Sequence, residues 1–357
     1  MRRTGHARLL LSALAALCVS ACGSVANAGS STANPPPATI RLGYLTNLTH
    51  APALIGLSRG YFQTALPAAT SLQTKTFSAG PAENEALLGG SLDAAFVGPS
   101  PAIKAFSSTR GGVVVVAGAA SGGAGLVVAP AIAAGNFPQD LKGQTLASPQ
   151  LGNTQDVALR TWLAQHNVST NVNGGGDVAI DTTSGNAIDL QRFVAHQIAG
   201  GWEPEPYESL YVVNGHGKVA VDEASLWPGG RFPTTLLVVT KTLLTQHPDI
   251  VDDLLEGLVK TIDWIQGNPS EAAAATSADL ASVTGSKPLS AAVLALAWSH
   301  LTFSVDPLAS ALQTEAAHAH QVGLLTSTNL SGILDVARLN AVLSAQGRTT
   351  VSAAGLG

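Results

Sequence analysis

Cysteine, charge and aromatic side chains are all scarce in this chain of 357 residues. It has two cysteines, Cys18 and Cys22, which both lie near its start, so the rest of the chain offers no disulfide, thiolate metal site or cysteine nucleophile. Charged residues make up 11% of the sequence and the formal net charge is −5, which argues against nucleic acid as a partner. After residue 39, no apolar run is long enough to span a bilayer.

Motifs of the common enzyme classes are missing as well. The sequence has no H-E-x-x-H, no P-loop and no complete G-x-G-x-x-G, and no nucleophile elbow joins a predicted strand to a helix. His318 and His320 lie two apart on a predicted helix, so they point to different faces and make a poor metal pair. We therefore expect a protein that is not an enzyme and has neither a cofactor nor a metal site.

The first residues have the pattern of a bacterial export signal. Three arginines precede an apolar run over residues 9–19, and the small residues Ser20 and Ala21 stand directly before Cys22. The apolar run is too short to cross a membrane. This order predicts a signal peptide over residues 1–21 that is removed, and a lipidated Cys22 that becomes the new N-terminus.

The segment that follows has the composition of a spacer. Residues 22–39 are rich in Ser, Gly, Ala, Asn and Pro and predict a linker that is first flexible and then stiff. The protein would then be held by a lipid anchor on the extracytoplasmic face of the cell membrane. A signal without lipidation, cleaved near residues 26–28, is the alternative.

Short β-type runs alternate with helix-type runs after residue 39, which is typical of α/β architecture with mostly parallel sheets. The expected strands cover residues 40–44, 72–77, 94–97, 113–117, 126–129, 145–147, 178–180, 211–213 and 235–239. Strand 72–77 is polar and is expected near an edge, whereas 113–116 is apolar on both faces, like a central parallel strand. The expected helices cover residues 52–59, 82–88, 102–106, 154–165 and 187–196.

The C-terminal third is expected to be mostly helical. From residue 248 the apolar residues recur at helical spacing, with further helical runs near 291–300 and 308–322, and the last residues look loosely held. Glycine and proline clusters at 122–125 and 227–230 mark two crossings between lobes. We therefore expect one lobe from residues 40–127 plus 231–357, and a second from residues 128–230, that hinge around a ligand.

Small, weakly charged loops follow several of the predicted strands. Ligands of open α/β sheets bind at the carboxyl ends of strands, where the first N–H groups of helices are free. The loops cover residues 46–50, 78–81, 98–101, 118–121 and 152–154, and Ser121 is the candidate from the fourth. Such helix starts bind anions through backbone N–H groups and the helix dipole. His50 is either a ligand contact or a capping and packing residue.

The segment from Trp202 to Tyr207 is the most unusual in the chain. It follows a strand-like run over residues 198–201 and places one aromatic side chain and two carboxylates, Glu203 and Glu205, beside two prolines. The segment forms either a wall of the cleft or, for Trp202, a packing contact between lobes. A carboxylate facing the pocket would favour a ligand that also carries an ammonium group.

Ordered motifs over residues 40–270 resemble the nitrate, taurine and aliphatic sulfonate binding proteins of ABC importers, most closely the aliphatic sulfonate branch. The stretches that carry the resemblance are Gly43-Tyr44-Leu45, His50-Ala51-Pro52-Ala53-Leu54, Gly60-Tyr61-Phe62, residues 86–94, residues 140–147, Gly152-Asn153-Thr154, Trp202-Glu203-Pro204 and Trp227-Pro228-Gly229-Gly230. The resemblance implies a type II periplasmic-binding-protein fold and a ligand cleft between two lobes. Carried over by position, it implies ligand contacts at Asn47, His50, Gly80, Pro99, Ser100, Asn153, Thr154, Trp202 and Glu205.

The resemblance also implies a biological role. The protein would be a monomer that captures a small anionic or zwitterionic solute, an aliphatic sulfonate or taurine, and delivers it to an ABC permease and its ATPase. Binding of nitrate or of a thiamine-pyrimidine precursor is the alternative. A pyrimidine-synthase-like enzyme and a sensor domain that reports to a membrane kinase are further alternatives, which the export signal and the lack of signalling segments disfavour.

Overall fold

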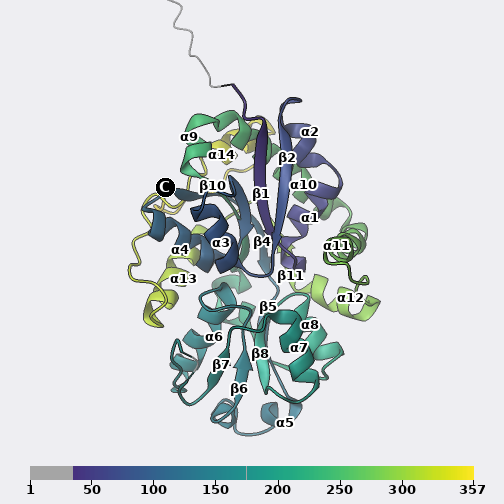
Figure 1. The fold of residues 1–357 in the computed structure, drawn as a ribbon, viewed down its shortest axis with the longest axis vertical. Coiled ribbons are helices and arrows are strands. Elements are labelled where there is room, and N and C mark those ends of the chain that lie inside the picture. The colour runs from purple at the N-terminus through teal and green to yellow at the C-terminus, as the bar shows by residue number, and fades with distance from the viewer. Residues whose placement is uncertain (1–34, 174) are drawn as a thin grey trace, which may run out of the picture. The chain divides into compact units, whose positions relative to one another are not determined.

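The structure, a computed structural model, describes residues 35–173 and 175–357. The predicted signal peptide, Cys22 and most of the predicted linker lie outside the described residues. Two sheets with helices around each form the described part (Figure 1). None of its helices is long and apolar enough to span a bilayer.

The first lobe is built on a six-stranded sheet with the order β11-β4-β10-β3-β1-β2. Strands β1, β2 and β3 run parallel to one another, whereas β10 is antiparallel to β3 and β4, and β11 is antiparallel to β4. The strands are β1 (Thr39–Leu45), β2 (Ser71–Phe77), β3 (Ala94–Val97), β4 (Val113–Gly122), β10 (Pro233–Thr240) and β11 (Leu301–Phe303).

The second lobe is built on a five-stranded sheet with the order β7-β6-β8-β5-β9. Strand β6 is parallel to β7 and β8, and β5 is antiparallel to β8 and β9. The strands are β5 (Ala124–Val128), β6 (Thr145–Ala147), β7 (Ala179–Asp181), β8 (Gly200–Pro204) and β9 (Lys218–Asp222). The α/β architecture and the type II periplasmic-binding-protein fold are confirmed. The expectation of mostly parallel sheets is wrong, because β5, β10 and β11 pair antiparallel with their neighbours and make both sheets mixed.

Helices connect the strands within each sheet and fill the C-terminal third, as the periodicity predicts. The α-helices are α1 (Ala51–Ser58), α2 (Tyr61–Ala65), α3 (Gly80–Leu88), α4 (Pro99–Thr109), α5 (Pro130–Ala133), α6 (Thr154–Gln165), α7 (Asn186–Val194), α8 (Tyr207–Val213), α9 (Lys241–Gln246), α10 (Pro248–Gly267), α11 (Pro269–Thr284), α12 (Ala291–Ser299), α13 (Ala309–Gln321) and α14 (Ala337–Ala345). Short 3-10 turns are η1 (Leu48–His50), η2 (Gln139–Leu141), η3 (Glu223–Leu226) and η4 (Pro228–Gly230).

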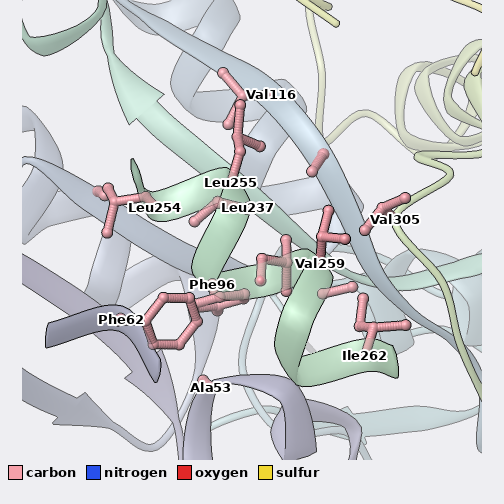
Figure 2. Packing of buried hydrophobic residues seen from close by; sticks show 14 of the residues in the cluster. Ala53, Phe62, Phe96, Val116, Leu237, Leu254, Leu255, Val259, Ile262 and Val305 are labelled. Carbon is pink, nitrogen blue, oxygen red and sulfur yellow. The ribbon is translucent and has the colours of Figure 1, made fainter. Parts of the chain in front are cut away.

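Helix α10 supplies much of the apolar core of the first lobe. Its residues Leu254, Leu255, Val259 and Ile262 are spaced by one, four and three positions, so they lie on one face of the helix. Figure 2 shows this face packed toward side chains of the sheet, such as Phe96, and toward α1 and α2. All four residues are buried, and burying a large aliphatic side chain contributes about 1.5–3 kcal/mol.

Two strand predictions are wrong in their details. The expected strand 211–213 lies inside α8, because Tyr211 packs its ring against Phe193 of α7, and this packing outweighs the β-propensity of Tyr-Val-Val. The expected central parallel strand 113–116 belongs to β4, which is buried but antiparallel to both of its neighbours. The polar strand β2 does lie at an edge of its sheet.

The chain passes between the sheets at two glycine-rich points. β4 ends at Gly122 and β5 begins at Ala124, so the first passage lies at Gly123, inside the glycine cluster at 122–125. Gly122 and Gly123 have φ of 78° and 72°, a region that glycine adopts without strain. The return lies between β9 and β10, over residues 223–232.

The C-terminal residues are held more firmly than expected. The backbone N–H groups of Gly332 and Leu334 both donate to the carbonyl of Leu356, at 3.1 Å each. The N–H of Val115 in turn donates to the carbonyl of Ile333 at 2.8 Å, which ties this segment to β4. The composition gave no sign of these pairs because they depend on backbone groups alone.

Candidate functional site

A small cavity lies where strand ends of both sheets meet, and we call it the interlobe cavity. Its volume is about 20 Å³, which is room for a single water molecule. It is lined by Leu45, Asn47, Thr49, His50, Gly80, Gly98, Pro101, Asn153, Thr154, Gln155, Pro204 and Thr234. The lining contains no lysine, arginine, aspartate or glutamate.

The first lobe contributes residues from three consecutive strand ends. Asn47 follows β1, Gly80 opens α3 after β2, and Gly98 precedes α4 after β3. Because β1, β2 and β3 are parallel, their carboxyl ends lie at one edge of the sheet, where helices α3 and α4 begin. The cavity is therefore faced by helix starts, which favour negative charge.

The second lobe contributes the start of α6. Asn153 caps this helix, since its side-chain Oδ1 accepts a hydrogen bond from the N–H of Asp156 at 2.9 Å. The next residue, Thr154, is 3% exposed, and its hydroxyl has no hydrogen-bond partner among the described residues. An added Cβ at Gly98 would lie 2.6 Å from that hydroxyl, so glycine there leaves the space that the cavity occupies.

A second unpaired hydroxyl comes from the first lobe. Thr234 on β10 is buried, and its Oγ1 also has no partner within residues 35–173 and 175–357. A buried hydroxyl without a hydrogen bond costs about 1–3 kcal/mol. Two such groups lining one cavity therefore favour a ligand that accepts hydrogen bonds.

His50 is present in the cavity as a neutral side chain. It is fully buried, and desolvation lowers its pKa to about 3. Its Nδ1 accepts a hydrogen bond from the N–H of Leu45 at 3.2 Å, so the proton of the neutral ring lies on Nε2. The imidazole can therefore donate a hydrogen bond to a ligand without adding a charge.

Direct contacts join the two lobes beside the cavity. The N–H of Leu48 in η1 donates to the carbonyl of Glu205, which follows β8, at 3.1 Å. The N–H of Glu205 donates to the carbonyl of Gly123 at 2.9 Å. The cavity is thus small because the lobes are in contact around it.

A larger groove of about 1130 Å³ continues from Asn47, and we call it the interlobe groove. Its walls come from both lobes and from α11, and Leu210, Leu280 and Leu289 give them an apolar character. The groove is lined by Thr46, Asn47, Ser78, Ala79, Ala82, Pro149, Gln150, Leu151, residues 182–188, Leu190, Gln191, Pro206, Tyr207, Leu210, Leu280, Thr284, Ser286 and Leu289. No charged side chain is among them.

The structure brings five of the ten expected ligand contacts to the interlobe cavity, namely Asn47, His50, Gly80, Asn153 and Thr154. It places Ser100, Pro99 and Ser121 elsewhere. The hydroxyl of Ser100 donates to Glu315, Pro99 is buried in the first turn of α4, and Ser121 lies on β4 opposite Thr302.

Trp202 does not form a wall of the cleft. It lies on β8, an inner strand, and is 0% exposed. Its Nε1 donates to Glu223 at 2.7 Å, and its ring lies 6.4 Å from that of Trp162. The side chain belongs to the core of the second lobe, because the alternation of β8 turns it toward α6.

The carboxylates of Glu203 and Glu205 do not line the interlobe cavity either. Glu205 accepts hydrogen bonds from the N–H and the hydroxyl of Ser209 and from His300. Glu203 lies near Tyr211, and burial raises its pKa well above the ordinary value. The reason to expect a zwitterionic ligand, a carboxylate in the pocket, is therefore removed.

The remaining lining residues were missed at the sequence level. Thr49, Gly98 and Pro101 lie in loops that were recognised, beside residues that were chosen instead. Thr234 lies at the start of β10, which is antiparallel to its neighbours, so no strand-to-helix loop marks it. Pro204 ends β8 within the segment from Trp202 to Tyr207, where other residues were chosen. The hydroxyl of Thr234 would have been found only by knowing that β10 lies next to β3.

Comparison with known proteins identifies relatives by fold and family. No curated protein sequence matches the chain. The alkanesulfonate-binding protein SsuA from Xanthomonas axonopodis pv. citri, solved with bound MOPS, is 21% identical with a TM-score of 0.67, over 83% of this chain and 96% of that one. The periplasmic aliphatic sulphonate binding protein SsuA from Escherichia coli is 20% identical, with a TM-score of 0.63, over 84% and 91%.

The periplasmic nitrate-binding protein NrtA from Synechocystis PCC 6803 has a TM-score of 0.72 at 15% identity, over 86% of this chain and 89% of that one. At these identities the likeness shows a common fold. The resemblance stated from the sequence motifs is confirmed by a sequence profile that matches residues 33–282. The chain belongs to the NMT1-like family.

Proposed function

We propose that this chain is the solute-binding component of an ABC importer and that the interlobe cavity binds the anionic head of a sulfonate-like solute. One observation carries the proposal: neutral donors from both lobes surround a cavity at the starts of helices, and two buried hydroxyls there lack partners. Such a site stabilises an anion through hydrogen bonds and helix dipoles without a counter-charge. The solved relatives that bind alkanesulfonate and nitrate support the same chemistry.

The interlobe groove favours an organic sulfonate over a bare inorganic anion. It continues from the cavity at Asn47 and offers apolar side chains such as Leu280 and Leu289 to a substituent. Because neither the cavity nor the groove is lined by a carboxylate, an ammonium group would find no partner there. A simple alkanesulfonate therefore fits better than taurine, and both fit better than nitrate.

Binding requires the lobes to separate and close again. A cavity of about 20 Å³ cannot admit a sulfonate group while Leu48 N–H stays bonded to the carbonyl of Glu205. The solute would enter while this contact is open, and closure would complete the donor set from both lobes. The closed form is what a permease would recognise.

Calorimetry on the purified chain tests the proposal. Butanesulfonate, taurine, nitrate and a thiamine-pyrimidine compound are titrated separately. We expect micromolar binding of butanesulfonate, weaker binding of taurine, and little heat from nitrate. The assignment would be overturned if neither butanesulfonate nor taurine binds, or if the thiamine-pyrimidine compound binds most tightly.

We also propose that Cys22 carries a lipid anchor that holds the protein at the outer face of the cell membrane. The three-part signal and the small residues directly before Cys22 support this. Two or more acyl chains are needed for stable anchoring. Labelled palmitate should enter the wild-type protein in cells and should be absent from Cys22→Ala, which should appear in the soluble fraction; equal labelling of both would exclude Cys22.

A further inference from the structure

Three ligand-type side chains meet at the passage between the lobes, and we call them the hinge cluster: Glu205, Glu208 and His300. Glu205 follows β8 and Glu208 lies in the first turn of α8, both in the second lobe, whereas His300 lies between α12 and β11. Figure 1 shows α12 beside α8, and residues of the two helices contact one another. One atom from each of the three side chains lies within 4.8 Å of the other two.

Glu208 is the member of the cluster without a hydrogen bond. It is 3% exposed, and no donor in the described part of the chain is bonded to its carboxylate. The nearest basic atom is Nδ1 of His300, at 3.9 Å from Oε1. A cation between the three side chains would give the Glu208 carboxylate the partner that no protein donor supplies.

Glu205 is already oriented in the way a metal ligand requires. Its Oε2 accepts from the N–H of Ser209 at 3.1 Å, and its Oε1 accepts from the Ser209 hydroxyl at 2.8 Å and from His300 Nδ1 at 2.7 Å. Each carboxylate oxygen has two lone pairs, so Oε1 can bind a metal in place of the His300 N–H while Ser209 keeps its position, and the Nδ1 proton is released when Nδ1 itself binds the ion. Such outer hydrogen bonds are typical of carboxylates that bind metals.

We propose that Glu205, Glu208 and His300 bind a divalent first-row transition ion, with Zn²⁺ as the best match, at the passage between the lobes. One imidazole and two carboxylates suit zinc better than magnesium or calcium, which prefer all-oxygen sites. Zinc bonds of about 2.0–2.2 Å place neighbouring ligand atoms roughly 3.3 Å apart in a tetrahedron. The distances of 2.7 and 3.9 Å from His300 Nδ1 to the two carboxylates lie on either side of that value.

The fourth ligand of the proposed ion would be water. The side chain of His300 is 33% exposed, whereas those of Glu205 and Glu208 are 0% and 4% exposed. Water therefore reaches the cluster from the His300 side and can complete the tetrahedron. Asp222, which adds to the negative field at Glu208 and His300, further favours a cation.

A cation here would join the lobes. The backbone of Glu205 bonds to Gly123 at the first passage and to Leu48 beside the interlobe cavity. Fixing the carboxylate of Glu205 to His300 would hold the second lobe against the first in the closed arrangement. The site is separate from the interlobe cavity, so its existence does not depend on which solute the protein binds.

Zinc titration of the whole chain tests the site. The protein is purified in detergent without a histidine tag, stripped with a chelator, and titrated with Zn²⁺ by calorimetry in the absence of solute. We expect one ion per chain with micromolar affinity, and weakening of about tenfold or more in both Glu208→Gln and His300→Gln. The control His320→Gln, at an exposed position on α13, should bind Zn²⁺ like the wild type.

Thermal unfolding shows whether a variant has lost metal binding or has failed to fold. Without metal, Glu208→Gln should unfold near the temperature of the wild type, because the Glu208 carboxyl makes no hydrogen bond that the substitution would remove. Zn²⁺ should raise the unfolding temperature of the wild type and leave that of Glu208→Gln unchanged. No stoichiometric binding, unchanged binding in His300→Gln, or equal binding of Ca²⁺ would each overturn the proposal.

Discussion

The interlobe cavity and the hinge cluster lie at the same boundary between the sheets but are built from opposite chemistry. The cavity is lined by neutral donors, with His50 uncharged and the hydroxyls of Thr154 and Thr234 unpaired. The hinge cluster gathers carboxylates, and other buried acids such as Glu223 and Glu315 lie nearby. Keeping negative charge away from the cavity lets it accept an anion, while the acids respond to cations and protons.

The largest expected effect is on the pH dependence of the free energy of unfolding, which the buried acids such as Glu223 determine. Burial, and then Glu315, raise the pKa of Glu223 to about 8, so its carboxyl is neutral in the folded protein and ionised in the unfolded one at neutral pH. The stabilising contribution is complete below the ordinary pKa of 4.5 and is lost as the pH rises through about 8. The loss for this one group is on the order of 3 kcal/mol.

Denaturant unfolding at pH 5 and pH 8 measures this loss. Glu223→Gln keeps an oxygen for the Trp202 indole but cannot ionise, so its free energy of unfolding should fall less between the two pH values than that of the wild type. Glu271→Gln, whose side chain is 63% exposed in the wild type, is the control and should keep the wild-type slope. If the free energy of unfolding of Glu223→Gln falls as much between pH 5 and pH 8 as that of the wild type, Glu223 does not contribute to the pH dependence of stability.

The next effect is expected from filling the cavity. A Cβ at Gly98 would lie 2.6 Å from the Thr154 hydroxyl, so Gly98→Val should weaken binding of butanesulfonate at least about 100-fold, or roughly 2.7 kcal/mol. Gly267→Val is the matched control, since a Cβ at Gly267 meets nothing within 4 Å. Calorimetry measures both variants, and wild-type affinity in Gly98→Val would move the solute site out of the cavity.

A smaller loss should follow from removing one unpaired hydroxyl. Thr154→Val keeps the shape of the side chain and should weaken sulfonate binding about tenfold, because one donor to the anion is lost. Thr161→Val is a close control: Thr161 lies on the same helix, and its buried hydroxyl also lacks a partner but does not line the cavity. Equal affinities for the two variants would contradict a role for Thr154 in binding.

Two variants of Asn153, the cap of α6, test separately how this residue contributes to stability and to binding. Asn153→Ala should lower the free energy of unfolding by about 1 kcal/mol, because Oδ1 no longer accepts from Asp156 N–H. Asn153→Ser should keep the cap and most of that stability while losing the amide N–H₂ as a donor. Chemical unfolding and calorimetry on both variants test this, and an unstable Asn153→Ser would mean that the amide contributes more than the cap.

In the last prediction the protonation state of His50 does not change with pH. Because burial lowers the pKa of His50 to about 3, its ring should stay neutral from pH 5 to pH 8, and its NMR resonances should not shift over that range. Exposed histidines in the same spectrum act as internal controls. A His50 resonance that titrates near pH 6 would mean that the cavity carries charge after all and that the contrast with the hinge cluster is weaker.

The sequence could predict local features of the fold and site. Asn47, Gly80 and Thr154 were found because each lies in a loop where a strand passes into a helix, and such loops meet at one edge of a parallel sheet. The long helix α10 was visible from its spacing of apolar residues.

What could not be predicted depends on partners distant in sequence. Glu205 was expected to face the ligand, but His300 lies 95 positions further along the chain and binds its carboxylate. Trp202 was expected beside the cleft, but Glu223 and Trp162 place it in the core. The hinge cluster was missed altogether, because Glu205 and His300 share no local spacing that signals a metal site.

The two unpaired hydroxyls in the interlobe cavity also have a consequence for the empty protein. If the lobes close without solute, Thr154 and Thr234 find no hydrogen-bond partner among the described residues, and the cavity has room for only one water molecule to serve both hydroxyls. A hydroxyl left without a partner costs about 1–3 kcal/mol, whereas bulk water satisfies both groups in the open form, so the unliganded population shifts toward open states. A solute that accepts both hydrogen bonds removes this penalty, and the importer would then spend ATP on loaded carriers in preference to empty ones.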